Sequence, residues 1–161
     1  MIKFKTLNLV VSWLMVIATM LIIYSFSGET AQESTQTSGD IIESTLKLVL
    51  PDEKVTDELV SDLQLPIRKL AHFSIFALLG FTLANAFKIT FKIKLIFNYL
   101  LSLASVIIYA STDELHQGLI DGRGPSFKDV LIDSFGGLTG ILVFALMLFM
   151  FNKLITKKDR E

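Results

Sequence analysis

Apolar residues gather in four long runs along the chain, separated by polar segments. The runs cover residues 7–26, 67–87, 95–112 and 127–151. A helix needs about 20 residues to cross the roughly 30 Å hydrocarbon core of a bilayer, and each run is close to that length. Backbone groups in lipid must form their hydrogen bonds within the segment, so each run is predicted to be a helix. The pattern therefore predicts an all-α, polytopic membrane protein with four transmembrane helices, in one domain over residues 1–161.

The first run also has some features of a secretory signal peptide. Lys3 and Lys5 precede it, and Ser25, Phe26 and Ser27 are loosely like a cleavage site. The run is longer than the roughly 7- to 15-residue apolar core of a typical signal peptide. We therefore interpret it as a retained helix.

The segment between the first two runs, residues 28–66, is long for a connection and has its own pattern. Apolar residues recur at helical spacing, first as Ile42, Leu46, Val49 and Leu50, then as Val55, Leu59 and Leu63. This predicts two short amphipathic helices separated by Pro51. We expect them to lie on the membrane surface or cap the bundle, with a lid over a polar site as the alternative. Pro66 is expected in the first turn of the second transmembrane helix.

Basic residues mark one side of the membrane. They occur in the N-terminal tail, between the second and third runs, and in the C-terminal tail, as Lys3, Lys5, Lys88, Lys92, Lys94, Lys153, Lys157, Lys158 and Arg160. The charged residues of the segment 28–66 are mostly acidic, with only Lys47 and Lys54 as basic residues. Because short cytoplasmic segments are rich in lysine and arginine, the N and C termini are predicted to be cytoplasmic. Residues 28–66 then lie outside the cell membrane, and the stretch from Ser111 to Gly140 turns around at its outer face.

Polar residues concentrate where the second, third and fourth predicted helices approach this outer face. The candidates are Arg68, Lys69, His72, Asp113, Glu114, His116, Gln117, Arg123, Asp129 and Asp133. A charge at bilayer depth costs several kcal/mol unless it is paired or lines a wet cavity, so such residues indicate a functional site. We therefore predict a polar site at the outer mouth of the bundle.

Spacing suggests how some of these residues are arranged. Arg68 and His72 are four residues apart and share a helix face. If the third helix continues for a further turn, Asp113 aligns with His116 and Glu114 with Gln117. The simplest account of the two charge signs is that Arg68, Lys69 and Arg123 are countercharges for Glu114, Asp129 and Asp133.

The start of the fourth helix has two further signals. Ser126 precedes Asp129 by three residues, which predicts an N-terminal cap. Gly136 and Gly140 have the small-xxx-small spacing that lets another helix approach closely.

Composition removes several classes of function. The chain has no cysteine, which excludes disulfides, cysteine metal sites and a thiol nucleophile. No basic stripe or glycine-rich phosphate loop is present, so no nucleic-acid partner is expected. The candidate histidines and carboxylates are suitable metal ligands, but their spacing matches no typical metal site. We therefore predict no metal and no cofactor.

Several motifs together carry a family resemblance. They are Arg68-Lys69-x-x-His72-Phe73, then Asp113-Glu114-x-His116-Gln117, then Arg123, and then Lys128-Asp129-Val130 through Asp133 to Gly136, with a weaker match at Tyr24-Ser25-Phe26-Ser27. In this order they resemble the VanZ-like family of small bacterial integral membrane proteins, named for a teicoplanin-resistance protein. The resemblance implies a polytopic cell-membrane protein. For the namesake it also implies reduced sensitivity to teicoplanin-type glycopeptides without altered peptidoglycan precursors. No catalytic residue is carried over from the family to this sequence.

Three functions are compatible with these residues. In the first, an enzyme acts on an envelope lipid or its phosphate-linked glycan, and Arg68, Lys69 and Arg123 hold the anionic head group. His72 or His116 would then be the acid or base, oriented by Asp113 or Glu114, with Gln117, Asp129 and Asp133 as further binding residues. Enzyme status stays open at this point.

In the second function, the same pocket only binds a membrane lipid, a lipid-linked envelope precursor or a lipoglycopeptide. In the third, the charges only hold the helices together. The sequence leaves the oligomeric state open.

Overall fold

The computed structural model describes residues 2–158, and the side chains of residues 5–52 and 54–156. Over these residues the elements are α1 (Ile2–Ser27), α2 (Ala31–Val49), a 3-10 helix η1 (Asp52–Lys54), α3 (Asp57–Thr90), α4 (Leu95–Gln117) and α5 (Phe127–Lys158). No strand occurs in this part of the chain. The predicted all-α fold class is confirmed.

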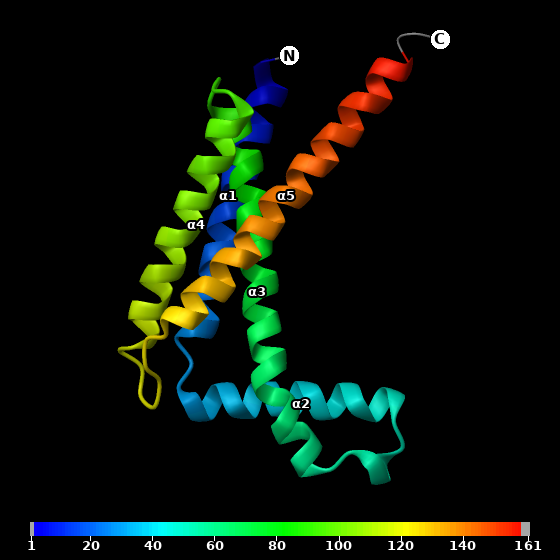
Figure 1. Cartoon of the computed structure of the whole chain (residues 1–161), viewed down its shortest axis with the longest axis vertical. Coiled ribbons are helices and arrows are strands. Elements are labelled where there is room, and N and C mark those ends of the chain that lie inside the picture. The colour runs from blue at the N-terminus through cyan, green and yellow to red at the C-terminus, as the bar shows by residue number, and fades with distance from the viewer. Residues whose placement is uncertain (1, 159–161) are drawn as a thin grey trace.

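Four helices, α1, α3, α4 and α5, are long and apolar enough to cross a membrane, as predicted. They run along the length of the molecule, while α2 lies across one end (Figure 1). The start of α1, the α3–α4 connection and the end of α5 lie at the opposite end from α2 and the α4–α5 connection (Figure 1). The basic segments thus share one end. The side chains of Lys3, Lys157 and Lys158, and the whole of Arg160, lie outside the described residues.

The outward surfaces of these four helices are apolar. Leu14, Leu21, Ile108, Leu142 and Phe149 are among many large apolar side chains that are more than half exposed. Soluble proteins rarely expose contiguous apolar surface on this scale. The surface therefore suits lipid as the surrounding solvent.

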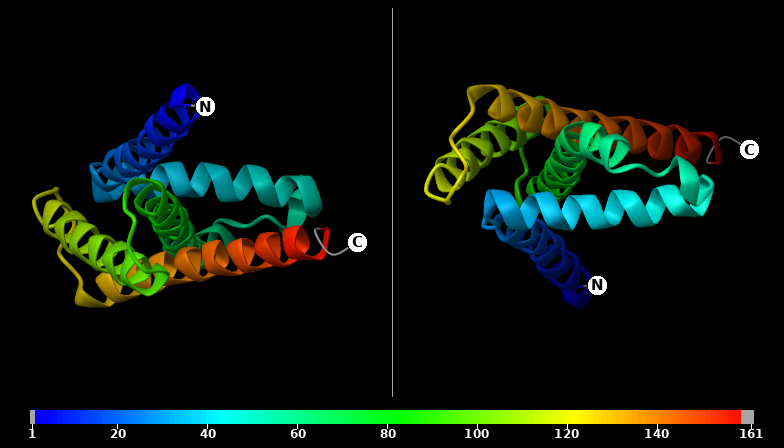
Figure 2. Two further views of the ribbon diagram at one scale, coloured as in Figure 1. Left: turned by 90° about the horizontal axis from the view of Figure 1, so that it is seen from above. Right: turned by 90° about the horizontal axis from the view of Figure 1, so that it is seen from below.

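Helix α3 is the centre of the bundle. Figure 2 shows it between α1 on one side and α5 on the other, and its buried Phe76 and Leu79 pack with Val16, Val106 and Ala110 of the neighbouring helices. Helix α3 therefore contacts each of the other three long helices.

The contact between α3 and α5 depends on glycine. A Cβ atom at Gly136 would overlap the carbonyl oxygen of Phe73, and one at Gly140 would overlap that of Ala77. The predicted close approach of another helix at these glycines is confirmed, and the helix is α3.

The structure corrects the prediction at Pro66. Helix α3 already begins at Asp57 and continues through Pro66, so the second amphipathic segment is its first part. The Thr56 hydroxyl accepts a 3.3 Å hydrogen bond from the Leu59 amide, which starts the helix early. Proline removes the hydrogen bond to the Asp62 carbonyl, but both residues are exposed and polar surroundings can solvate that oxygen.

The first amphipathic segment also begins earlier than predicted, at Ala31. The Thr30 hydroxyl accepts a 3.2 Å hydrogen bond from the Glu33 amide, and the Glu33 carboxylate accepts one of 2.9 Å from the Thr30 amide. This capping box fixes the start of α2. Helix α2 then packs against α3, with Ile42 buried.

Candidate functional site

A polar pocket of about 250 Å³ opens between α3, the end of α4, the α4–α5 connection and the start of α5. Eight of the candidate residues line it, namely Arg68, Lys69, His72, Glu114, Gln117, Arg123, Asp129 and Asp133. The rest of the wall is formed by Ala31 of α2, Leu65 of α3, Gly122 and Gly124 of the connection, and Ile132 of α5. The structure thus brings together polar residues that are far apart in the sequence.

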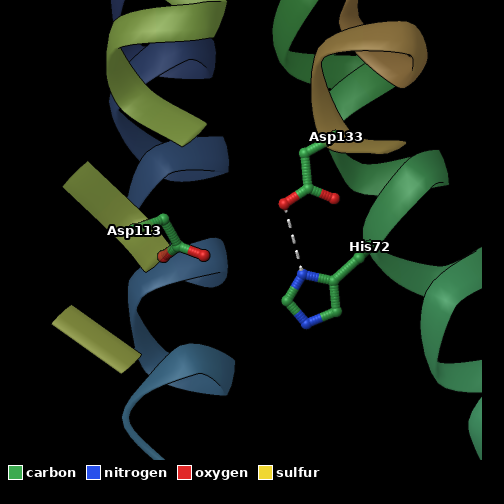
Figure 3. Close-up of side chains that lie close together, drawn as sticks. All are labelled: His72, Asp113 and Asp133. Atoms are coloured by element: carbon green, nitrogen blue, oxygen red, sulfur yellow. Dashed lines mark ion pairs between the residues drawn. The ribbon is translucent and has the colours of Figure 1, made fainter. Parts of the chain in front are cut away.

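Three of the candidates meet beside this pocket, each from a different helix. Figure 3 shows the side chains of His72 of α3, Asp113 of α4 and Asp133 of α5 close together, with Asp133 next to His72 and Asp113 across from both. One nitrogen or oxygen atom of each of these side chains lies within 4.8 Å of those of the other two. We call His72, Asp113 and Asp133 the three-helix cluster.

Asp133 is the most buried member of the three-helix cluster, with 1% of its surface exposed. Neither of its carboxylate oxygens has a hydrogen-bond partner among the described residues. The His72 imidazole lies next to it, with its Nδ1 3.8 Å from Asp133 Oδ2 (Figure 3). That distance is too long for a hydrogen bond. A buried carboxylate without partners is costly, so this position needs an explanation.

Asp113 is also buried but well supported. The Ser27 hydroxyl and the Gln117 amide donate hydrogen bonds of 2.9 and 3.0 Å, both to its Oδ2 atom. Helix α4 continues to Gln117, as the predicted alignment required, but the side chain that contacts Asp113 is Gln117 and not His116. Sequence reasoning gave Ser27 no role, and its only signal was the Tyr24–Ser27 motif.

Of the three carboxylates predicted to pair with a basic side chain, only Asp129 does so among the described residues. Lys69 Nζ lies 2.8 Å from Asp129 Oδ1, and both side chains are more than one third exposed. The Glu114 carboxylate instead accepts a 2.7 Å hydrogen bond from the Ser126 amide. Pairing of Glu114 or Asp133 with an arginine was wrong, because a backbone amide and His72 are their respective neighbours.

The same turn confirms the predicted cap of α5. The Ser126 hydroxyl accepts a 3.3 Å hydrogen bond from the Asp129 amide. The cap holds the start of α5, and therefore Asp129 and Asp133, at the pocket.

Two arginines line the pocket without an ion pair among the described residues. Arg123 donates a 3.3 Å hydrogen bond to the Ser27 carbonyl, and Arg68 has no carboxylate within ion-pair distance in that part of the chain. Burial and, next, the nearby Arg68 guanidinium lower the pKa of Arg123. The two neighbouring guanidinium groups repel each other, so an anion bound beside them would be favourable.

His116 lies apart from the other candidates. Its ring stacks on Tyr24 of α1, with ring centres 4.6 Å apart, and it does not line the polar pocket. Its buried Nδ1 has no hydrogen-bond partner among the described residues. Of the two histidines, His72 is the one in the pocket.

A second, apolar groove of about 440 Å³ adjoins the polar pocket between α1, α2 and α3. Its walls include Ile23 and Phe26 of α1, Ile41 of α2 and Ile75 of α3. Arg68 and His72 line both spaces. The site therefore offers a charged compartment joined to an apolar one.

Comparison with known proteins gives one match. A family model described as VanZ/LLP1 matches residues 12–149, which include every candidate site residue. No curated protein and no solved structure matches the chain. The family match confirms the resemblance drawn from the motifs.

Proposed function

The chain belongs to the VanZ/LLP1 family, and from this premise we propose that it binds the phosphate-bearing head group of a cell-envelope lipid. The head group occupies the polar pocket, and part of an acyl or prenyl chain occupies the apolar groove. Such a ligand has one charged end and one apolar end, like the two adjoining spaces. The function proposed is recognition of an amphipathic anion within the membrane.

The observation that carries this proposal is the position of Arg68. Its side chain borders both the polar pocket and the apolar groove. It has no ion-pair partner in the described part of the chain, whereas the neighbouring Lys69 is already paired with Asp129. A guanidinium at the junction of a wet and an apolar space suits the phosphate of a lipid whose chain extends away from it.

Arg123 supplies a second cation to the same anion. It reaches the pocket from the α4–α5 connection and is tied to the end of α1 through the Ser27 carbonyl. Arginine presents a rigid fork of donors that matches phosphate oxygens. Together the two arginines would hold a phosphate from opposite elements, α3 and the α4–α5 connection.

The basic residues at the opposite end of the bundle favour an outward-facing pocket. An outer-leaflet lipid or a lipid-linked envelope precursor would then enter from the apolar groove. By the family resemblance, capture of such a lipid, or of a lipoglycopeptide, would lower sensitivity to teicoplanin-type glycopeptides. Loss of both arginines should abolish that effect without lowering the amount of protein in the membrane.

Native mass spectrometry of the full chain in detergent tests the proposal. The probe is phosphatidic acid, which carries a phosphate monoester, and phosphatidylcholine is the neutral comparison. We expect preferential binding of phosphatidic acid, weakened at least about tenfold in Arg68→Gln/Arg123→Gln, because each charged contact to phosphate contributes about 1.5 kcal/mol or more.

The matched control is Lys54→Gln, which removes an exposed cation in the connection before α3. It should bind phosphatidic acid like the wild type. Equal binding by the wild type and the double-arginine variant would contradict the proposal. If the arginine variant is poorly folded while Lys54→Gln is not, the charges hold the bundle together, which also contradicts it.

A further inference from the structure

We propose that His72, Asp113 and Asp133 form a binding site for one divalent transition-metal cation, of the Zn²⁺ or Mn²⁺ type. The site lies at the buried side of the polar pocket, where α3, α4 and α5 meet (Figure 3). Spacing along the sequence did not predict it, because each helix supplies a single ligand. This inference does not depend on the lipid proposal, which rests on Arg68 and Arg123.

The geometry of the three-helix cluster is close to that of a bound ion. Two ligands that are each about 2.1 Å from a cation are at most about 4.2 Å apart. His72 Nδ1 and Asp133 Oδ2 are 3.8 Å apart, and all three ligand atoms lie within 4.8 Å of one another. Small side-chain rotations therefore bring all three onto one ion.

The burial of Asp133 is the independent sign of a ligand. Its side chain is 1% exposed, and both oxygens lack hydrogen-bond partners among the described residues. An isolated carboxylate in such a place would be strongly destabilising. A cation bound next to His72 supplies the partner that the protein itself does not.

Asp113 has the support expected of a metal ligand. Ser27 and Gln117 both donate hydrogen bonds to its Oδ2. Metal-binding carboxylates are commonly oriented by such outer hydrogen bonds. Ser27 itself is fully buried, so its hydroxyl is held in place at the end of α1.

The charges around the pocket also favour a cation. Four carboxyl groups, Asp113, Glu114, Asp129 and Asp133, meet three permanently cationic groups, Arg68, Lys69 and Arg123. With His72 neutral, the carboxylates are in excess by one. A divalent ion would make the net charge positive, and so would also favour an anionic ligand at the mouth.

The donor set selects the class of metal. One imidazole nitrogen and two carboxylate oxygens suit zinc, manganese and related first-row ions. Calcium takes six to eight oxygen ligands, more than this cluster offers. Three protein ligands leave at least one coordination position of the metal open. Catalytic zinc sites have the same number of protein ligands and hold a water molecule or a substrate in the fourth position.

The test uses the full chain in detergent, stripped with a chelator and then equilibrated with ZnCl₂ or MnCl₂. Bound metal is measured by inductively coupled plasma mass spectrometry after gel filtration, and affinity by isothermal titration calorimetry. We expect about one ion per chain, as for one three-ligand site. Loss of an outer-shell partner lowers metal affinity by roughly 10- to 100-fold. Asp133→Asn and Asp113→Asn each remove a direct ligand, so the metal affinity of each variant should fall by more than that.

Asp121→Asn is the matched control, because it removes an exposed carboxylate of the α4–α5 connection outside the cluster. It should bind the metal like the wild type. The wild-type titration needs no variant, so failure of both Zn²⁺ and Mn²⁺ to bind would overturn the proposal. Unchanged affinity in a folded Asp133→Asn or Asp113→Asn protein would overturn it as well. Loss of metal binding with lipid binding retained would separate this site from the arginine pair.

Discussion

The hydroxyl of Ser27 donates a 2.9 Å hydrogen bond to Oδ2 of Asp113, 86 residues later in the chain. Both residues are buried, at 0% and 4% exposure. The bond joins the end of α1 to the end of α4 beside the polar pocket. The end of α1 is therefore part of the site, and the Tyr24–Ser27 motif has a structural reason to accompany the charged motifs.

Ser27→Ala should destabilise the protein by about 1–2 kcal/mol. The substitution removes one of two donors to a buried carboxylate, and hydrogen bonds between membrane helices are worth about 0.6 to 2 kcal/mol. Unfolding by denaturing detergent, followed by circular dichroism, measures the difference. Ser25→Ala is the control, since that exposed hydroxyl donates to the Leu21 carbonyl of its own helix. Equal stability of the two variants would show that the Ser27 bond contributes little.

Gly140→Ala should weaken the α3–α5 contact by about 1–3 kcal/mol, the usual cost of overpacking. The new methyl group would overlap the Ala77 carbonyl oxygen, and backbone cannot move aside as a flexible side chain can. The same unfolding assay applies. Gly124→Ala is its control, because no atom lies within 4 Å of the added carbon there. A Gly140→Ala protein as stable as Gly124→Ala would contradict the close crossing.

The helices could be predicted because their signals are local. Length and hydropathy identified four spans, and the Ser126 cap and the Gly136–Gly140 spacing were visible within one segment. The error at Pro66 arose because a proline is equally compatible with the first turn of a helix and with a kinked interior. The outcome depended on the cap at Thr56, upstream of the apolar run.

Contacts between helices were less predictable. Which face of α4 turns toward α5 depends on packing, so Asp113 and Glu114 could be chosen as candidates while their partners could not. His116 shows the limit most clearly, because it lies in the same motif as Asp113 but stacks on Tyr24. The three-helix cluster has no sequence signature, since its three residues are separated by two helix connections.

The start of α2 should be sensitive to acid. Hydrogen bonds from the Thr30 amide and hydroxyl lower the pKa of Glu33 below its usual 4.5. Its capping contribution is therefore fully present above pH 4.5 and is lost as the pH falls through the lowered value. Hydrogen exchange of the Ser34 amide, expressed as protection relative to the unfolded chain, should show this loss.

Glu33→Gln is the comparison for that measurement, because a neutral amide can still accept these hydrogen bonds but does not titrate. Its protection should be nearly independent of pH below 4.5. Glu43→Gln, in the exposed Lys47 pair on the same helix, should leave the acid dependence of the α2 start unchanged. An identical pH profile in Glu33→Gln and the wild type would rule out Glu33 as its source.

In the proposed orientation the polar pocket opens to the outside of the cell, and single-cysteine labelling tests this orientation most directly. The natural chain has no cysteine, so Asp121→Cys in the α4–α5 connection and Lys92→Cys in the α3–α4 connection each provide one reactive thiol. In intact cells, a membrane-impermeant maleimide should label the cysteine at 121, and should label that at 92 only after the membrane is opened. Labelling of the cysteine at 92 in intact cells, with that at 121 protected, would place the pocket at the cytoplasmic face and contradict the account.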